Sequence, residues 1–574
     1  MTDASQYSIV EPRLDVEVHL PDGRVIQGPR NSQVGSFLQV LPAVDQPPIV
    51  GAIVNGELRE LTYPVQIDCN VRPVSMGDAD GMRIYRRSLT FLLETAFGRL
   101  YPGAVLTVDH SVAFGGYFCQ VMKRPPLSPA ELDQLEVCMQ ELVAADLKFE
   151  RQIVPIEEAL QYFREHGEED KVSLLVHRQK NYLTMYQLND HRDYHHGYMV
   201  PSTGYLRWFR LTPTGDGFTL RFPRRESPTQ LQPLPEYPKL LATFREYGDW
   251  LNRLGISSVG SLNKAIKNNR IHEIILVSEA LHEQRVSEIA AMIAEKKDRV
   301  RVVLIAGPSS SGKTTFSKRL SIQLLACGLN PFPLELDNYF VNRDQTPLDS
   351  DGKPDFESLN ALDLDLLARH LHRLIHGEKV RLPKFDFISG QRKPGFEVQL
   401  SSNDIIVLEG IHGLNPALLG NLPGHSTYRV YVSALTQINL DHYNRVSTTD
   451  TRLIRRIARD ARQRGYTAQQ TIQRWESVRR GERKYIFPYQ ENADTMFNSA
   501  LVYEISALRP IVEPLLRQVP FGTPEFVEAK RLLAFLEWFL PIEINLIPDN
   551  SILREFIGSS ILQNFAIWHN HNSE

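Results

Sequence analysis

Hydrophobic and polar positions follow different periods along the chain, and these periods divide it into segments. Val16, Val18 and Leu20 alternate with polar residues, which is the period of a half-buried strand. The turn sequence Pro21-Asp22-Gly23 follows, and Asn55-Gly56 separates two further strand-like runs. We therefore expect short strands joined by tight turns up to residue 83.

A helical period replaces this alternation from Ile84 onward. The apolar residues at helix spacing are Leu89, Leu92, Leu93, Ala96 and Leu100. Mixed strand signals continue to Phe222, and the polar, proline-rich stretch 223–235 has the composition of a linker. Residues 240–297 are again mostly helical, so they predict a connector of helices.

A short β-branched run, residues 301–306, then stops at a glycine, as strands buried in a parallel sheet do. Alternating strand and helix signals continue to about residue 510. This order of elements predicts an α/β fold whose C-terminal half has a parallel sheet with helices on both faces.

The loop after this strand matches GxxxxGK[ST], a motif that binds phosphate when it joins a strand to a helix. Its backbone N–H groups and the helix N-terminus would surround the phosphates of a nucleotide. Lys313 would reach the β- and γ-phosphates, and the Thr314 hydroxyl would bind Mg²⁺. The residues expected to bind ATP are Gly307, Ser309, Ser310, Ser311, Gly312, Lys313, Thr314 and Thr315.

Two carboxylates follow strand-like runs later in the chain. Glu409 ends an apolar run and precedes Gly410, which suits a second acid at the metal, although an ordinary strand end has the same pattern. Asp337 follows the run at 334–336, where strand ends converge on the phosphates. From its position alone, Asp337 is equally well a catalytic base or a helix N-cap.

Residues 445–484 contain eleven arginines and one lysine against four acidic residues. Arg452, Arg455, Arg456 and Arg459 recur at helical spacing, opposite apolar positions. Such a helix fits a lid that stabilises charge on a transferring phosphoryl group, a nucleic-acid patch, or a solvated face.

Composition adds mainly exclusions. The 574 residues exceed the size of one hydrophobic core, and 42% hydrophobic with 23% charged residues is typical of globular proteins. A net charge of −4 provides no general attraction for nucleic acid or membranes. Four dispersed cysteines argue against a disulfide framework, and no signal or membrane-spanning stretch is recognised, so a cytoplasmic location is expected.

Residues 300–510 resemble the uridine kinase branch of the phosphoribulokinase/uridine kinase family. The matching segments are the loop 307–315, Leu336–Tyr339, 355–363, Pro383–Arg392, Glu409-Gly410 and 450–465. The resemblance implies that Asp337 is the catalytic base and that Glu357 binds ribose hydroxyls. It also implies that Phe385 and Arg392 lie in a nucleoside-contacting loop. Finally, it implies that Arg456 contacts the substrate, with Arg459 and Arg464 on the phosphates.

Several positions depart from that family's pattern. Phe385 and Gly390 stand where a tyrosine and a histidine contact the base in members that act on uridine and cytidine. Arg474 replaces a base-contacting glutamine, and Tyr466 replaces an arginine just after the lid. Arg474 would suit an anionic acceptor, so a sugar phosphate stays open beside a nucleoside.

The N-terminal half resembles the front of threonyl-tRNA synthetases, with a β-grasp TGS module and an α+β editing-type domain. The metal and base positions of the editing site read Arg87, Phe91, His195 and Met199 here, so hydrolytic editing is not expected. His191, His195 and His196 could nevertheless form a metal site, and the alternative is that they are polar residues of a surface loop.

We therefore expect a TGS-like domain at 1–83, an editing-like domain with a degenerate site at 84–232, a helical connector at 233–298, a kinase domain at 299–520 and an extension at 521–574. The expected activity is transfer of the γ-phosphoryl of ATP to a hydroxyl of a nucleoside or related sugar-containing acceptor, with Mg²⁺ held by Thr314 and Glu409. The alternative is a nucleotide-gated RNA-binding or regulatory protein. Contact with RNA through the N-terminal half and association into homo-oligomers both stay open, and a membrane partner is not expected.

Overall fold

The computed structural model describes residues 11, 13–42, 47–112, 115–348, 352, 354–386, 389–419 and 426–565. The chain forms two compact units. Unit 1 contains Met1–Pro235, Asp441–Arg445 and Pro520–Arg531, and unit 2 contains the remainder. None of the helices in these ranges combines the length and the apolar character needed to cross a membrane.

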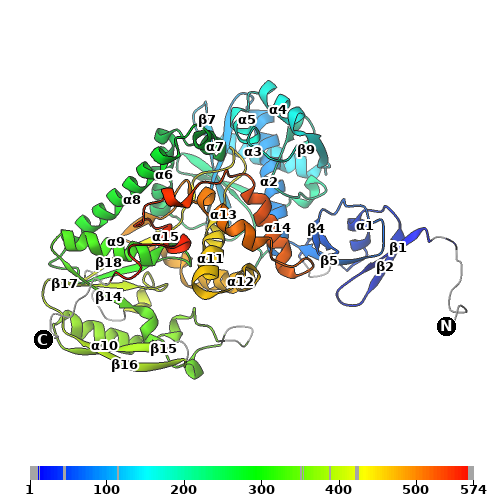
Figure 1. The fold of residues 1–574 in the computed structure, drawn as a ribbon. Coiled ribbons are helices and arrows are strands. Elements are labelled where there is room, and N and C mark those ends of the chain that lie inside the picture. Colours follow the sequence, from blue (N-terminus) through cyan, green and yellow to red (C-terminus); the bar gives the residue numbers. More distant parts are fainter. Residues whose placement is uncertain are drawn as a thin grey trace, which may run out of the picture. The chain divides into compact units, whose positions relative to one another are not determined.

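Unit 1 begins with a five-stranded sheet in the order β2-β1-β5-β3-β4 (Figure 1). Val16 and Val18 point into its core, as the alternating pattern predicts, and Asn55-Gly56 forms the turn of a hairpin with positive φ at both residues. A short helix, α1, packs under the sheet. These elements are β1 (Asp15–His19), β2 (Val25–Pro29), α1 (Val34–Leu38), β3 (Ile49–Val54), β4 (Glu57–Arg59) and β5 (Cys69–Ser75).

The rest of unit 1 is built around α2 (Ala79–Leu100), a helix buried over most of its surface. Its apolar residues form one core with α3 and the strands of a four-stranded sheet, β11-β12-β7-β6. A second sheet has the order β10-β9-β8. The bounds are β6 (Val105–Val112), β7 (Gly116–Met122), α3 (Pro129–Ala144), β8 (Glu150–Pro155), α4 (Ile156–Glu165), α5 (Glu169–Leu175), β9 (Tyr182–Leu188), β10 (His191–Asp193), β11 (Arg210–Thr214) and β12 (Gly217–Arg221).

Unit 2 contains a five-stranded, all-parallel sheet in the order β14-β17-β13-β18-β19. All five residues of β13 are buried, because helices cover both faces of the sheet. On one face Val302 and Leu304 pack with α10, and α9 contacts the same strands. The strands are β13 (Val302–Ala306), β14 (Asn330–Glu335), β17 (Asp404–Glu409), β18 (Thr427–Ser433) and β19 (Thr495–Asn498).

The chain order of these strands differs from their order in the sheet, since β13 lies between β17 and β18. Loops that leave neighbouring strands in opposite directions open a crevice at the carboxyl ends of a parallel sheet. The loop after β13 starts at this crevice. The α/β fold class expected for the C-terminal half is therefore confirmed.

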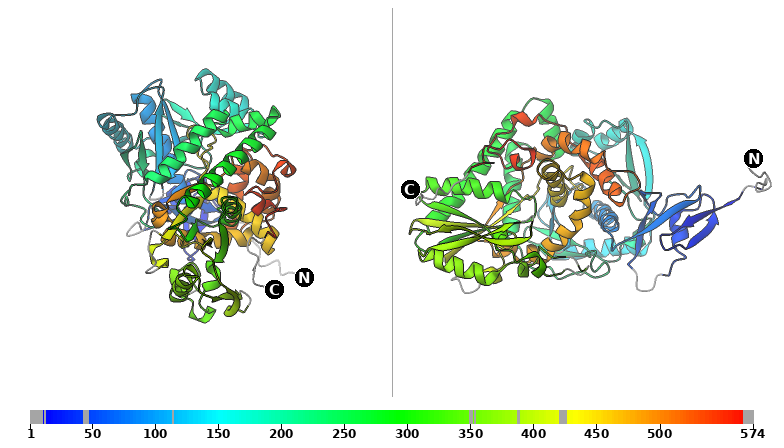
Figure 2. Two further views of the ribbon diagram at one scale, coloured as in Figure 1. Left: turned by 90° about the vertical axis from the view of Figure 1, so that its left-hand side faces the viewer. Right: turned by 60° about the horizontal axis from the view of Figure 1, so that its bottom comes forward.

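The other elements of unit 2 extend this sheet. The hairpin of β15 and β16 lies beside α10 (Figures 1 and 2). The bounds are α6 (Pro238–Leu254), α7 (Val259–Lys267), α8 (Ile271–Ala294), α9 (Lys313–Ala326), α10 (Leu364–Ile375), β15 (Val380–Asp386), β16 (Gln391–Val398), α11 (Thr448–Arg464), α12 (Ala468–Tyr485), α13 (Glu504–Leu516) and α15 (Arg554–Ile557). Another helix, α14 (Pro524–Leu536), starts in unit 1 and ends in unit 2.

Candidate functional site

The glycine-rich loop runs from Gly307 to Gly312 and delivers the chain into α9, which begins at Lys313. A Cβ added to Gly307 would lie 1.9 Å from the carbonyl oxygen of Val432, so no larger residue fits there. Ser310 and Ser311 are buried in the loop. The close passage of the loop against β18 explains why this position requires glycine.

The two residues expected to hold the metal lie at the end of β17 and in the first turn of α9. Glu409 ends β17 in register with Ile305 of β13, and its Oε1 accepts a hydrogen bond of 3.0 Å from the Thr314 hydroxyl. Burial raises the pKa of Glu409 to about 7, while the nearby Lys313 opposes this rise. Two hard oxygens beside a phosphate loop fit a small divalent cation such as Mg²⁺.

Asp337 lies in the turn just past the end of β14. Strand β14 is the neighbour of β17 in the sheet. Burial and the charge of Glu335 raise the pKa of Asp337, and the charge of Lys313 lowers it. Next to it, the Asn338 amide oxygen accepts a 3.2 Å hydrogen bond from the backbone N–H of Phe385. Asp337 is thus held at the same sheet edge as the glycine-rich loop.

On the side predicted to bind the acceptor, Glu357 lies against the backbone of α12, since its Cβ is 2.9 Å from the position of a Cβ on Gly481. Burial and the charge of Glu482 raise the pKa of Glu357 to about 7, and Arg456 opposes the rise. Phe385 is buried edge-to-face on Phe340, with ring centroids 5.6 Å apart.

The nucleoside-loop segment is only partly described, because Phe387 and Ile388 lie outside the described residues. Arg392 forms a 2.9 Å ion pair with Asp363, and its backbone N–H donates to Asn342. A Cβ at Gly390 would lie 2.8 Å from Nε of Arg343. The space next to position 390 is therefore taken by the Arg343 guanidinium.

Arg474 is exposed on α12, where its guanidinium stacks 4.4 Å from the ring centroid of Tyr466. The structure pairs these two residues, which are the two departures from the family pattern near the lid. Stacking over an aromatic ring holds the cation while leaving the edge of the guanidinium open to solvent.

Three arginines of α11 contact the glycine-rich loop. Arg452 Nε donates to the Ser309 carbonyl at 2.9 Å, and Arg455 Nη1 donates to the Ser310 carbonyl at 3.4 Å. Arg456 Nη1 donates to the Ser309 hydroxyl at 2.8 Å. A solvated face would not bury these side chains, so this part of the basic helix packs against the glycine-rich loop.

The three arginines predicted to contact substrate and phosphates share one partner. Arg456, Arg459 and Arg464 each pair with Asp460, at 3.2, 3.2 and 3.4 Å, and the Asp460 side chain is 1% exposed. The buried carboxylate of Asp460 therefore holds three guanidinium groups close together through charge-assisted contacts. Sequence reasoning named the arginines and missed this shared aspartate.

Two further carboxylates, which sequence reasoning also missed, bind the donors that a phosphate would need. Glu482 Oε1 accepts from the Ser309 N–H at 3.0 Å and also pairs with Arg452. Glu555 Oε2 accepts from the Thr315 N–H at 3.3 Å and from the Thr315 hydroxyl at 3.0 Å. No local motif marks Glu555, which lies in the extension far from the loop in sequence.

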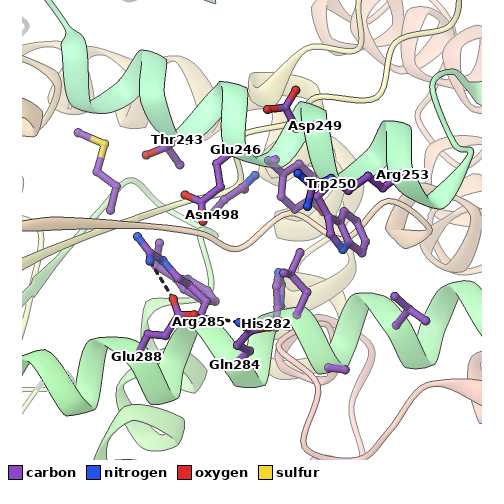
Figure 3. A pocket seen from close by; sticks show the side chains of 16 residues that line it. Thr243, Glu246, Asp249, Trp250, Arg253, His282, Gln284, Arg285, Glu288 and Asn498 are labelled. Atoms are coloured by element: carbon purple, nitrogen blue, oxygen red, sulfur yellow. Dashed lines mark hydrogen bonds and ion pairs between the residues drawn. The ribbon is translucent and has the colours of Figure 1, made fainter.

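A second feature of unit 2 is a cavity of about 480 Å³ between α6, α8 and β19 (Figure 3). Trp250 and Phe497 contribute apolar surface, while Arg253 and Arg285 supply charge. Burial lowers the pKa of His282, at the cavity wall, to about 3, so its ring is neutral. No sequence motif coincides with this cavity.

In unit 1, three of the positions that the resemblance assigns to an editing site hold residues that are neither the expected ligands nor the expected base. Arg87 donates to the Tyr198 carbonyl at 2.6 Å, and Met199 is 1% exposed in the core. Phe91 packs its ring against His195. Phe91 and Met199 therefore serve in packing and Arg87 in a structural hydrogen bond, and the loss of hydrolytic editing stays a prediction.

Comparison with known proteins gives two separate similarities. Residues 302–506 match the model of the Phosphoribulokinase / Uridine kinase family. The N-terminal part is similar to threonine–tRNA ligases. The ligase of Legionella pneumophila subsp. pneumophila is 32% identical over 203 residues, or 35% of this chain and 32% of the relative. That of Methylococcus capsulatus is 35% identical over 159 residues, or 28% of this chain and 25% of the relative.

This chain thus spans no more than 32% of the length of these two curated relatives. Among solved structures, a D-glycerate 3-kinase from Cryptococcus neoformans var. grubii serotype A covers 37% of this chain and 90% of its own, at 16% identity and a TM-score of 0.27. The two similarities fall on different halves of the chain.

Proposed function

We propose that unit 2 is an ATP-dependent kinase that transfers the γ-phosphoryl group to a hydroxyl of a nucleoside or a related sugar-containing acceptor. The observation that carries this proposal is the meeting of three parts at one sheet edge: the glycine-rich loop with its Thr314–Glu409 pair, the carboxylate of Asp337, and the arginines of α11. Phosphoryl transfer needs these three parts and little covalent chemistry from the protein.

In this proposal the loop N–H groups and Lys313 bind the phosphates, and Thr314 with Glu409 would hold Mg²⁺, which neutralises charge on the β- and γ-phosphates. Asp337 orients the acceptor hydroxyl and accepts its proton as the new P–O bond forms. Arg459 and Arg464, aligned by Asp460, approach the charge that develops on the transferring group.

Acceptor binding is assigned to Glu357, Phe385, Arg392, Arg456 and Arg474. An ionised Glu357 would accept hydrogen bonds from vicinal hydroxyls, which are the feature shared by ribose and other sugars. The Arg343 guanidinium fills the space beside Gly390, the position where the related nucleoside kinases have a histidine. Because the base-contacting histidine is absent, the site supports recognition of a sugar-containing acceptor and does not specifically support a pyrimidine base.

The competing hypothesis is an RNA-binding or regulatory protein in which ATP acts as a switch. It requires the arginines of residues 445–484 to form an open basic surface. Arg452 and Arg455, with exposed side-chain fractions of 1% and 0%, are instead committed to the loop and to buried glutamates. This arrangement favours the kinase.

The direct test measures ADP formation by the full-length protein with Mg²⁺-ATP against separate nucleosides, sugars and sugar phosphates. We expect turnover that depends on one class of acceptor and a phosphorylated product identified by mass spectrometry. Tight ATP binding without turnover on any acceptor would contradict the proposal and support the RNA-linked alternative, for which binding to structured RNA is the next measurement.

The position of Glu555 predicts that its carboxylate competes with the phosphates of a nucleotide for the same hydrogen-bond donors. Its carboxylate uses the N–H and hydroxyl of Thr315 at the N-terminus of α9, a position where negative charge is stabilised. Glu555→Gln removes that charge, so ATP should bind more tightly by about 0.5–1 kcal/mol, or about 2- to 5-fold. Calorimetric titration with ATP would measure the change.

The matched control is Glu543→Gln, an exposed glutamate of the same extension, which should leave ATP affinity unaltered. Weaker ATP binding in Glu555→Gln would show that Glu555 holds the loop in its binding form instead of competing with phosphate, and unchanged binding would show that Glu555 does not affect the nucleotide site.

A further inference from the structure

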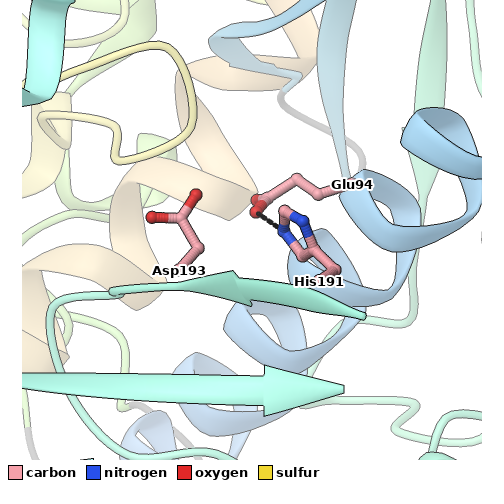
Figure 4. A group of neighbouring side chains, drawn as sticks. All are labelled: Glu94, His191 and Asp193. Atoms are coloured by element: carbon pink, nitrogen blue, oxygen red, sulfur yellow. Dashed lines mark hydrogen bonds and ion pairs between the residues drawn. The ribbon is translucent and has the colours of Figure 1, made fainter. Parts of the chain in front are cut away.

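A cluster of titratable side chains lies in unit 1, outside the kinase machinery. Strand β10 places His191 and Asp193 on the same face, because residues two apart in a strand share a face. Glu94, in the C-terminal half of the buried helix α2, points toward this face (Figure 4). His195 follows two residues after β10 and reaches the same carboxylate.

The donor atoms of the cluster converge. His191 Nε2 lies 3.4 Å from Glu94 Oε2, and His195 Nε2 lies 3.0 Å from Glu94 Oε1. One donor atom each from Glu94, His191 and Asp193 lie within 4.8 Å of one another. Ligand atoms bonded to a first-row metal ion at about 2.0–2.2 Å stand about 3–3.5 Å apart, so small side-chain rotations complete such a site.

The hydrogen bonding of the cluster leaves one acceptor unused. Both imidazoles bond to Oε2 of Glu94, and among the described residues Oε1 has no hydrogen bond of adequate geometry. The Glu94 side chain is 0% exposed, so water does not satisfy this oxygen from the surface. An unsatisfied buried carboxylate oxygen is costly, and coordination to a cation would remove that cost.

Charge at the site also favours a divalent cation. Lys171 is buried and pairs with both Asp193 and Glu168, the latter at 2.6 Å. The third carboxylate, that of Glu94, lies against the two imidazoles instead. A cation bound between Glu94 and Asp193 would place positive charge beside both carboxylates.

We propose that Glu94, His191 and Asp193, with His195 as a fourth donor, bind a first-row divalent transition metal, of which Zn²⁺ fits best. Two imidazoles with two carboxylates suit Zn²⁺, Co²⁺ or Ni²⁺ better than Mg²⁺ or Ca²⁺. Four ligands from the protein close the coordination shell, which is typical of a structural site. The metal would then fix α2 against β10, which is a role separate from phosphoryl transfer.

The ligands differ from those of the synthetase editing site. Of that site's four positions, only His195 keeps a metal-binding side chain, while Arg87, Phe91 and Met199 do not. His196, which the sequence grouped with the other histidines, is not among the residues whose donor atoms converge. The His191 side chain is 25% exposed and gives an ion access from solvent.

The test titrates the chelator-treated full-length protein with Zn²⁺ by calorimetry and with Co²⁺ by visible absorption. We expect one high-affinity ion per chain, the absorption of Co²⁺ bound to nitrogen and oxygen, and a rise in Tm on adding Zn²⁺. Glu94→Gln and His191→Gln should each weaken binding by more than about 10-fold, since each loses a direct ligand.

Two controls isolate the site. His166→Gln changes an exposed histidine of unit 1 whose Nδ1 contacts the Tyr162 carbonyl and whose ring stacks on that of Tyr162, and this variant should bind Zn²⁺ as the unmodified protein does. Glu409→Gln should also keep the Zn²⁺ site, which separates this inference from the kinase proposal. Absence of stoichiometric binding, or binding equal to that of the unmodified protein in His191→Gln, would overturn it. Because His191 lies partly in solvent, that variant decides the question even where Glu94→Gln fails to fold.

Discussion

Replacement of Asp337 by asparagine is expected to lower acceptor phosphorylation by about 10²- to 10⁴-fold, the usual contribution of a positioned base. The amide has nearly the same shape as the carboxylate but does not accept the proton of the attacking hydroxyl. Burial raises the pKa of Asp337, so the side chain becomes protonated more easily than a surface aspartate as the pH falls. Steady-state kinetics with the best acceptor measure the loss in kcat.

ATP affinity is the internal control of this experiment, because Asp337 lies beyond the loop donors and should leave the Kd for ATP unchanged. The matched variant is Asp344→Asn, an exposed aspartate of the same connection, with kinetics expected to equal those of the unmodified protein. Full turnover by Asp337→Asn would show that Asp337 is not the catalytic base, and Glu357 or Glu335 would be the next candidates.

The second large effect is expected on stability, from Arg455→Met. The Arg455 side chain is 0% exposed, pairs with the buried Glu504, and donates to both the hydroxyl and the carbonyl of Ser499. Its removal leaves a buried carboxylate without its cation, a loss of about 3–5 kcal/mol in the free energy of unfolding. Burial already raises the pKa of Glu504, and Arg455 is the group that opposes this rise.

Thermal unfolding measures this effect as a drop of about 2–4 °C in Tm for each kcal/mol lost. The double variant Arg455→Met with Glu504→Gln should recover part of the loss, because the orphaned charge is then gone. Arg517→Met is the control, since its side chain is 62% exposed in a surface pair with Glu513 and its contribution is small. A Tm for Arg455→Met equal to that of the control would show that the buried pair contributes nothing.

The two expected losses differ in kind. Asp337 acts on the reaction and leaves the fold intact, whereas Arg455 links α11 to the glycine-rich loop and to the turn after β19. Loss of Arg455 should therefore also weaken ATP binding. In the proposed kinase, α11 would therefore both support the glycine-rich loop and supply cations to the phosphates.

The candidate residues of the proposed kinase site could be named from the sequence because their signals are local. The glycine-rich loop, Lys313 and Thr314 are contiguous, and a buried strand that ends in a carboxylate marks Glu409 without knowledge of its neighbours. The parallel sheet is likewise determined locally, since runs such as 302–306 are apolar on both faces. The spacing of the arginines in 452–464 also indicated one helix, as observed.

Tertiary structure alone decided which charges meet. Glu482, Glu504 and Glu555 come from separate elements, and nothing in their local sequence marks them as partners of Arg452, Arg455 or Thr315. The cluster of Glu94, His191 and Asp193 has the same origin, because Glu94 and His191 are 97 residues apart and meet only in the folded chain. Local patterns determine elements and contiguous motifs, whereas the pairing of buried charges depends on the packing of distant segments.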